Sequence, residues 1–227
     1  MGKPGPKPLG KAKTEWSPNF AYALGLLATD GCLSRDGRHI DLTSKNLEQL
    51  ENFMKCLGIK VKIGYKTSGY TDKKYTRIQF SDSNLYQVLL GIGFTPAKTK
   101  TIAVLKIPER YFFDFLRGHL DGDGSFHAYW DPRWHSSFMF YTTFTSASKA
   151  HIDWIRATLG NILEIKGAID NTPRKSVYQL KYAKTESLKL IPRLYYHSGV
   201  VCLSRKRKKI EEILKVNREH NRNARVS

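Results

Sequence analysis

Ala23-Leu-Gly-Leu-Leu-Ala-Thr-Asp30-Gly31 and Leu116-Arg-Gly-His-Leu-Asp-Gly-Asp123-Gly124 are the two stretches that decide the fold of this chain. Each is an apolar helix pattern that ends in Asp-Gly, a dipeptide typical of the turn after a helix. Only the eighth position is acidic in both, because the sixth is Ala28 in one and Asp121 in the other. A role for each aspartate in its own turn would not explain the duplicated context. We therefore expect Asp30 and Asp123 to meet at the ends of two adjacent helices.

Small residues recur at four-residue spacing on both predicted helices: Ala21, Gly25 and Thr29 on the first, Gly118 and Gly122 on the second. Such a stripe lets two helix backbones approach closely. Two carboxylates brought together in this way repel each other unless a cation or a shared proton compensates. Oxygen ligands suit Mg²⁺, which takes one or two carboxylates together with phosphate oxygens and water. The pattern thus predicts a divalent metal site able to activate water against a phosphodiester.

The charge of the chain favours a nucleic-acid partner. Its 227 residues include 38 Lys and Arg against 20 Asp and Glu, a formal net charge of +18. This excess is well above the charge of about 2 to 8 that solubility requires, and neutralised phosphates release counterions. We find no apolar run near 18 residues and no signal peptide, which argues against a membrane. The cysteines Cys32, Cys56 and Cys202 lie far apart, as expected for reduced thiols of an intracellular protein in the cytoplasm, the nucleoid or an organelle.

The chain divides into three parts. Residues 1–16, rich in Gly, Pro and Lys, are predicted to form a flexible basic arm. Residues 17–106 and 107–227 are predicted to be two repeats of an αββαββα unit, the second with a basic C-terminal helix. Leading helices are expected at 18–30 and 108–123, hairpins at 32–44 and 125–146, and central helices between Ser44 and Gly58 and between Ser146 and Gly160. The later strands are expected at 59–66, 74–81, 162–168 and 176–183, followed by helices at 84–90 and 186–194. The fold class is therefore α+β.

Several predicted strands carry basic and amide side chains on one face. Lys60, Lys62 and Lys66 alternate with apolar residues, as do Arg77 with Gln79 and Gln179 with Lys181. A single strand of this kind could simply be solvated. Its recurrence in both repeats favours an antiparallel sheet that reads the DNA major groove.

These features together resemble the LAGLIDADG homing endonucleases, in particular the single-chain members with two repeats. Both nonapeptides match the family motif, although the first departs from it at Ala28 and Thr29, and the resemblance extends from about Ser17 to the final helix. It implies two repeats related by a pseudo-two-fold axis, with antiparallel sheets that form a saddle on DNA. It also implies that Asp30 and Asp123 are the catalytic, metal-binding acids, beside the carbonyl groups of Thr29 and Gly122.

The resemblance further implies a basic residue near each scissile phosphate, late in each repeat. Lys98 and Lys206 are the candidates, with Lys100 and Arg205 as near alternatives. A lysine there could polarise the attacking water or stabilise negative charge in the transition state. Lysines in such runs equally often only position the phosphate backbone.

We accordingly expect a monomeric, intron-encoded, Mg²⁺-dependent endonuclease that makes a double-strand break at a long asymmetric DNA site, with Ca²⁺ supporting binding without cleavage. The alternative is a transcription regulator or RNA splicing maturase of the same fold that does not cleave. Histidines and aromatic residues on the second hairpin lack metal-ligand spacing and suit base or sugar contacts better. The expected DNA contacts are Arg35, Arg38, Lys60, Lys62, Lys66, Lys74, Arg77, Gln79, His127, Tyr129, Trp130, Arg133, Trp134, His135, Lys166, Arg174, Lys175, Gln179 and Lys181.

Overall fold

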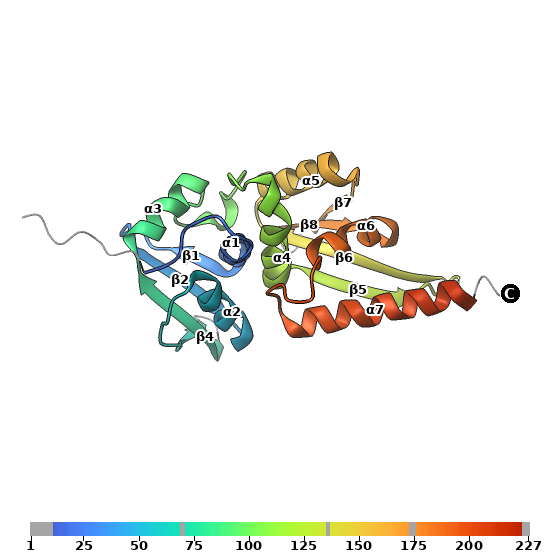
Figure 1. Ribbon diagram of the computed structural model, residues 1–227, viewed down its shortest axis with the longest axis horizontal. Coiled ribbons are helices and arrows are strands. Elements are labelled where there is room, and N and C mark those ends of the chain that lie inside the picture. The colour runs from blue at the N-terminus through green and yellow to red at the C-terminus, as the bar shows by residue number, and fades with distance from the viewer. Residues whose placement is uncertain (1–10, 69–70, 135–136, 173–175, 224–227) are drawn as a thin grey trace, which may run out of the picture.

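The computed structural model describes residues 11–68, 71–134, 137–172 and 176–223, which form two repeats on either side of a central helix pair (Figure 1). The first repeat contains α1 (Pro18–Asp30), β1 (Gly31–Leu33), β2 (His39–Ser44), α2 (Leu47–Leu57), β3 (Gly64–Ser68), β4 (Thr71–Ser81) and α3 (Ser83–Ile92). The second contains α4 (Phe112–Asp123), β5 (Ser125–Trp130), β6 (Phe138–Ser146), α5 (Lys149–Leu163), β7 (Ala168–Thr172), β8 (Val177–Tyr182) and α6 (Lys184–Leu194). The predicted α+β class and αββαββα order are confirmed.

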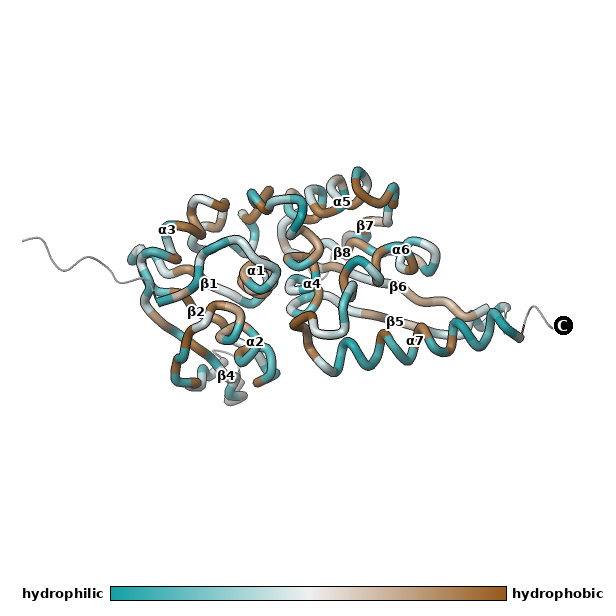
Figure 2. Tube along the Cα trace, in the orientation of Figure 1, coloured by the Kyte–Doolittle hydropathy of each residue, from teal (hydrophilic) through white to brown (hydrophobic). Residues whose placement is uncertain are grey.

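Three further helices lie outside this repeated order in the described part of the chain. The short 3-10 helices η1 (Lys98–Lys100) and η2 (Glu109–Tyr111) lie between the repeats, and α7 (Ser204–Asn223) follows α6. The α7 helix runs along the edge of the second repeat (Figure 1). Its side toward the protein carries buried Ile210 and Ile213, and hydrophilic residues occupy most of its remaining surface (Figure 2).

Each repeat contains one antiparallel four-stranded sheet, with strand order β1-β2-β4-β3 in the first and β5-β6-β8-β7 in the second. The registers correspond: Leu42 pairs with Ile78 in the first sheet, and Phe144 pairs with Leu180 in the second. These four side chains are fully buried and point toward the helices. Because strand residues alternate, their neighbours form the opposite surface, which none of the described helices covers and which we call the open face.

The α1 and α4 helices pack directly against each other and form the seam between the repeats (Figure 1). Gly25 and Gly118 lie where their backbones are closest. A Cβ atom on Gly118 would lie 3.1 Å from the Cα of Gly25 and on top of the carbonyl oxygen of Tyr22. The predicted close approach at the small residues is therefore confirmed, and it brings the C-terminal ends of both helices together.

Helix ends follow the expected capping chemistry. The Ser17 side chain accepts a hydrogen bond of 3.1 Å from the backbone N–H of Phe20 and so caps α1. Pro18 then occupies the first position of the helix. Asn46 and Ser148 cap the helices α2 and α5 in the same way. The second leading helix differs from the prediction because its first turn is the 3-10 helix η2, and α4 begins only at Phe112.

Some predicted boundaries are wrong. The strand expected at 59–66 begins at Gly64, so Lys60 and Lys62 precede it in an irregular segment. The strand expected at 162–168 is replaced by the end of α5, which continues past Gly160, and β7 begins only at Ala168. Gly160 does not end α5 because Glu164 adopts the left-handed conformation that closes it four residues later.

Part of the predicted flexible arm is packed. The backbone N–H groups of Lys11 and Ala12 donate to the Asp82 carboxylate at 2.7 and 2.9 Å, and Trp16 stacks on Tyr111 with ring centroids 6.1 Å apart. Residues 1–10 lie outside the described chain. None of the described helices is long and apolar enough to span a membrane.

Candidate active site

Asp30 and Asp123 are the last residues of α1 and α4, so the packed helix pair places both carboxylates at one junction. Burial raises the pKa of Asp123 to about 6, and the nearby charge of Asp30 raises it further. At Gly122 the helices leave no room for a side chain, since a Cβ atom there would lie 2.9 Å from Oδ2 of Asp30. The close packing that brings the acids together therefore also requires glycine at this position.

Gln49 fixes the orientation of the Asp30 carboxylate, and the sequence analysis missed it. Its Nε2 donates to Oδ2 of Asp30 at 2.6 Å, while Ser44 donates its hydroxyl proton to Oε1 of Gln49 at 2.9 Å. Burial raises the pKa of Asp30, and the Gln49 hydrogen bond opposes that rise. A polar residue on the otherwise apolar side of α2 was the available signal, since Gln49 is buried.

Lys98 lies at the C-terminal end of α1. Its ammonium group donates hydrogen bonds to the carbonyl oxygens of Ala28 at 2.8 Å and Thr29 at 3.3 Å. The side chain is buried, and burial lowers its pKa to about 8. The predicted lysine thus lies beside the aspartates, but in a buried position that the sequence did not reveal.

Lys206 has the corresponding position at the end of α4. Its Nζ donates to the carbonyl oxygens of Asp121 at 2.9 Å, Gly124 at 2.7 Å and Gly122 at 3.4 Å, and also to that of Leu120. Burial lowers the pKa of this lysine to about 8, as it does for Lys98. Two lysines from equivalent places in the repeats therefore bind the ends of the two motif helices.

Contacts with both repeats hold the segment that carries Lys206. Asp121 accepts hydrogen bonds at 2.8 Å from the hydroxyl group of Tyr22 and from the backbone N–H of Leu203. Glu48 of α2 accepts a hydrogen bond of 2.9 Å from the backbone N–H of Ser204, at the start of α7. The extra motif acid Asp121 therefore has a structural place in the second repeat, on the chain that leads to Lys206.

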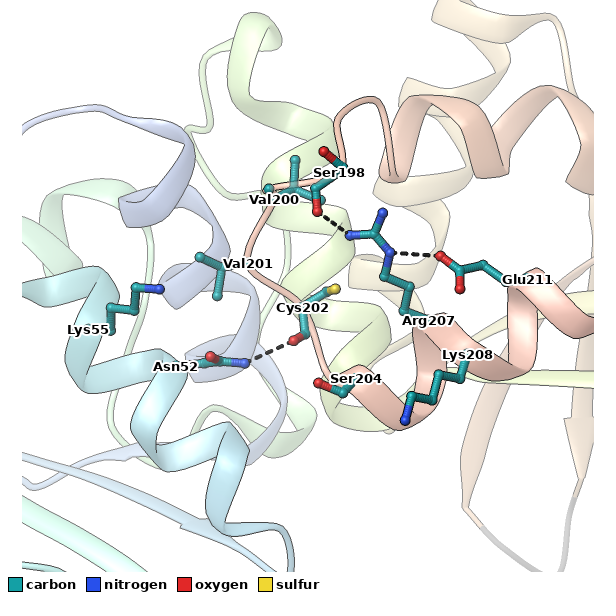
Figure 3. A pocket seen from close by; sticks show the side chains of 11 residues that line it. Asn52, Lys55, Ser198, Val200, Val201, Cys202, Ser204, Arg207, Lys208 and Glu211 are labelled. Carbon is teal, nitrogen blue, oxygen red and sulfur yellow. Dashed lines mark hydrogen bonds and ion pairs between the residues drawn. The ribbon is translucent and has the colours of Figure 1, made fainter.

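Figure 3 shows the pocket beside these contacts, a hollow of about 390 Å³ between α2 and the chain that leads into α7. Asn52 donates to the carbonyl oxygen of Cys202 at 3.0 Å, and Arg207 binds the Glu211 carboxylate at 3.0 Å. Arg207 also donates to the carbonyl oxygen of Ser198 at 2.6 Å. The Asn52 bond joins the chain before α7 to the first repeat, and the Arg207 bonds hold the first turns of α7 within the second repeat.

Of the two alternative basic residues, Arg205 lines a hollow of about 280 Å³ beside Asp30, together with Gln49 and Gly122. Lys100 is exposed in η1. A second hollow, of about 220 Å³, lies beside Asp123 and is lined by Lys98, His119 and Ser146, among others. Each aspartate therefore opens onto its own cavity.

The junction fits a hard divalent cation. The two carboxylates would supply its oxygen ligands; the carbonyl groups of Thr29 and Gly122, which the resemblance implied as further ligands, accept long hydrogen bonds from Lys98 and Lys206. In the described part of the chain no three His, Cys, Asp or Glu side chains gather around one point. Two carboxylates without a complete protein cage suit Mg²⁺, which retains waters and binds substrate phosphate.

On the open face of the first sheet, Arg77 forms an ion pair with Asp41, and Gln79 is exposed. Lys60 and Lys62, which precede the strand, line a hollow together with Gln79 of this face and Phe80 of the opposite one. Register places Lys66 opposite Tyr75, on the Arg77 side, and Lys74 on the opposite face. Lys74 is therefore not brought together with the other predicted contacts.

The open face of the second sheet carries His127, Tyr129, Gln179 and Lys181. Lys181 forms an ion pair of 2.9 Å with Asp170, and Tyr129 stacks on Tyr141 with ring centroids 6.2 Å apart. Trp130 ends the strand β5 on its other face, and its side chain is about half exposed. The strand β5 extends to this residue, so alternation turns its side chain toward the helices, where it contacts Phe138 and His220 of α7.

The remaining predicted contacts lie outside the regular strands. Arg38 and Arg133 form ion pairs with Asp36 and Asp131 on the two hairpin turns, and Trp134 is exposed. Arg35 lies on the first of these turns, and Lys166 is exposed just before β7. His135, Arg174 and Lys175 lie outside the described residues.

No family model matches the chain, and no curated protein matches it by sequence. Among solved structures, the LAGLIDADG meganuclease I-AabMI bound to uncleaved DNA superposes with a TM-score of 0.61 at 12% identity, covering 92% of each chain. The homing endonuclease I-DmoI in complex with DNA and Ca gives a TM-score of 0.53 at 18% identity, covering 80% of this chain and 91% of that chain.

The full-length protein DUF199/WhiA from Thermatoga maritima gives a TM-score of 0.56 at 18% identity. This match covers 90% of the present chain but only 63% of the WhiA chain. At these identities the likeness establishes the fold. With its two αββαββα repeats joined at a pair of Asp-Gly helices, the chain has the LAGLIDADG fold shared by homing endonucleases and WhiA.

Proposed function

We propose that this protein is a DNA endonuclease that makes a divalent-metal-dependent double-strand break at a long, asymmetric site. The observation that carries the proposal is the junction of α1 and α4, where two neighbouring, partly desolvated carboxylates lie beside two buried lysines. Holding two like charges together away from bulk water is costly unless a cation compensates, and the lysines are already bonded to carbonyl groups. A protein that only binds DNA gains nothing from such a pair.

The residues of the junction have separable roles. Asp30 and Asp123 would hold the cation, which supplies an activated water and stabilises the phosphate charge. Lys98 and Lys206, with pKa values lowered to about 8, could hold or release a proton near neutral pH. In hydrolysis the water oxygen forms a bond to phosphorus, the bond to the leaving oxygen breaks, and that oxygen takes up a proton.

The open faces of the two sheets would bind the DNA. I-AabMI and I-DmoI were each solved on DNA, I-DmoI with Ca, and a variant of I-DmoI with nicked target DNA and Mn. A divalent metal therefore has support from proteins of this fold, and we propose Mg²⁺ for this chain. We further propose that it acts inside the cell as a monomer, since two fused repeats already provide both halves of a site. Encoding within an intron remains an expectation from the family resemblance alone.

The second candidate function is DNA binding without cleavage. The likeness to WhiA, which is not described as an endonuclease, favours it. Both motif acids are present in this chain, and we therefore place cleavage first.

A selection experiment separates the two functions. The protein is incubated with a randomised double-stranded DNA library and Mg²⁺, and both the cut ends and the bound uncut molecules are sequenced. The proposal expects paired cut ends at one long sequence. Enrichment of bound DNA without any cut ends would establish the binding function and refute the nuclease.

Point variants then test the junction. Asp30→Asn and Asp123→Asn should each abolish double-strand cleavage while DNA binding in Ca²⁺ persists. Asp153→Asn is a matched control, because Asp153 is a partly exposed acid on α5 paired with Lys149. Full cleavage by either junction variant would overturn the assignment.

A further inference from the structure

The two halves of the junction differ at one structurally equivalent position. Gln49 and His151 each follow the serine that ends the preceding strand, Ser44 and Ser146, by five residues. Both lie in the first turn of the central helix of their repeat and both are buried. A neutral amide in the first repeat is therefore replaced by an imidazole in the second.

In the first repeat, the amide serves the catalytic acid directly. The Ser44 hydroxyl group binds Oε1 of Gln49, which leaves Nε2 to donate to Asp30 at 2.6 Å. Because both ends of the amide are bonded, its orientation is fixed. The Asp30 carboxylate is thus held in one direction before any ligand arrives.

In the second repeat, the imidazole is engaged elsewhere. Nδ1 of His151 lies 2.8 Å from the carbonyl oxygen of Ala103, and the ring stacks on His119 with centroids 5.3 Å apart and planes at 23°. Nε2 of His151 is buried without a hydrogen-bond partner. Within the described ranges no side chain donates a hydrogen bond to Asp123.

His119, the ring on which His151 stacks, also differs from its counterpart in the first repeat. His119 is the fourth residue of the second motif, and the corresponding residue of the first motif is Leu26. Burial keeps the pKa of both histidines below the ordinary value, so both rings are neutral at physiological pH. His119 lines the cavity beside Asp123, and His151 stacks on it from behind without lining that cavity.

We propose that the two half-sites cut their DNA strands at different rates, with the Asp30 half-site faster, because Gln49 positions Asp30 whereas His151, in the equivalent place, does not bind Asp123. This inference rests on the proposed nuclease function. A carboxylate that is already held in its reactive orientation adds less to the activation free energy than one that must be ordered during the reaction. The enzyme would therefore release nicked DNA before linear DNA.

The test measures the rate of each strand separately. A duplex that carries the selected site has a different fluorophore on each strand and is cut in single turnover with Mg²⁺. We expect the two rates of the wild-type protein to differ by about tenfold, equivalent to about 1.4 kcal/mol in activation free energy. Nicked circles should accumulate when a supercoiled plasmid is the substrate.

Variants assign the difference to the residues. The double variant His119→Leu/His151→Gln copies Leu26 and Gln49 into the second repeat, and it should accelerate the slower strand until the two rates are about equal. Gln49→Leu should slow the strand that the wild-type protein cuts first. Lys149→Gln, an exposed change on the same helix as His151, should leave the ratio unchanged. Because the two rates come from one protein, a general loss of folded enzyme cancels in their ratio.

Each outcome decides the question. Equal strand rates in the wild-type protein would overturn the inference while leaving the nuclease function intact. Unequal rates that neither Gln49→Leu nor the double variant changes would remove the difference between Gln49 and His151 as the cause. If neither strand is cut, the proposed function itself is refuted.

Discussion

Gly118→Ala should destabilise the protein by forcing α1 and α4 apart. The added methyl group would overlap the backbone carbonyl oxygen of Tyr22 and lie 3.1 Å from the Cα of Gly25. Overpacking a core costs about 1 to 3 kcal/mol, and the upper end applies because a backbone cannot rotate away as a side chain can. Alanine recovers about 1 kcal/mol of helix propensity. The expected net loss is about 2 kcal/mol.

Thermal unfolding followed by circular dichroism measures this loss. For a chain of this size 1 kcal/mol corresponds to about 2 to 4 °C, so the Tm should fall by about 4 to 8 °C. Gly91→Ala is the matched control, since Gly91 lies in α3, where an added methyl group would have no neighbour within 4 Å. That change should gain up to about 1 kcal/mol.

Activity provides a second measurement on Gly118→Ala. At a temperature where the variant is folded, cleavage should still fall, because a shift of about 1 Å at reacting groups can cost about 100-fold in rate. An unchanged Tm for Gly118→Ala, alongside the expected gain for Gly91→Ala, would refute the close approach of the helices.

Three further predictions concern charge. The pKa of Asp123 rises from the ordinary 3.8 to about 6, so the folded state binds more protons than the unfolded state between these values, and stability falls as pH rises through them. The Tm of Asp123→Asn should therefore exceed that of the wild type at pH 7.5 without metal, and the two Tm values should be equal near pH 4. A lower Tm for the variant at pH 7.5 would contradict this. Lys62→Gln should reduce the slope of log DNA affinity against log salt concentration by about 1, whereas Lys189→Gln, at an exposed position, should leave it unchanged. Equal slopes for the wild type and Lys62→Gln would exclude the open face as the DNA-binding surface. Lys206→Met should lower the free energy of unfolding by about 2 kcal/mol or more, and by more than Lys98→Met, because more buried carbonyl groups lose their donor; denaturant titration checks the order.

The sequence was sufficient for the architecture because the information was local and repeated. Ser17 with Pro18 marked the start of α1, and each Asp-Gly marked a helix end. The paired serines and glycines located the central helices, although Glu164 rather than Gly160 closes α5. Because the chain is duplicated, most of these signals occur once in each repeat, and the two copies support each other.

The site was predictable only in part, since its details depend on contacts between distant segments. Lys98 and Lys206 were identified by their place in each repeat, but their burial against helix ends comes from tertiary packing. Gln49 is 19 residues from Asp30 along the chain, and only the packing of α2 on α1 brings the two together. Trp130 was expected on the hairpin loop, but the strand β5 extends to this residue, and alternation places its side chain on the helix side of the sheet.

The meeting of two helix C-termini sets the local charge of the junction. Each helix end carries roughly half a negative charge from its aligned peptide dipoles, the two aspartates add two negative charges, and the two lysines cancel two. The sum is about minus one in the protein alone, and a divalent cation would change it to about plus one. The metal-free junction therefore repels a phosphate and the loaded junction attracts it. Metal and DNA should thus each increase the affinity for the other, by equal factors.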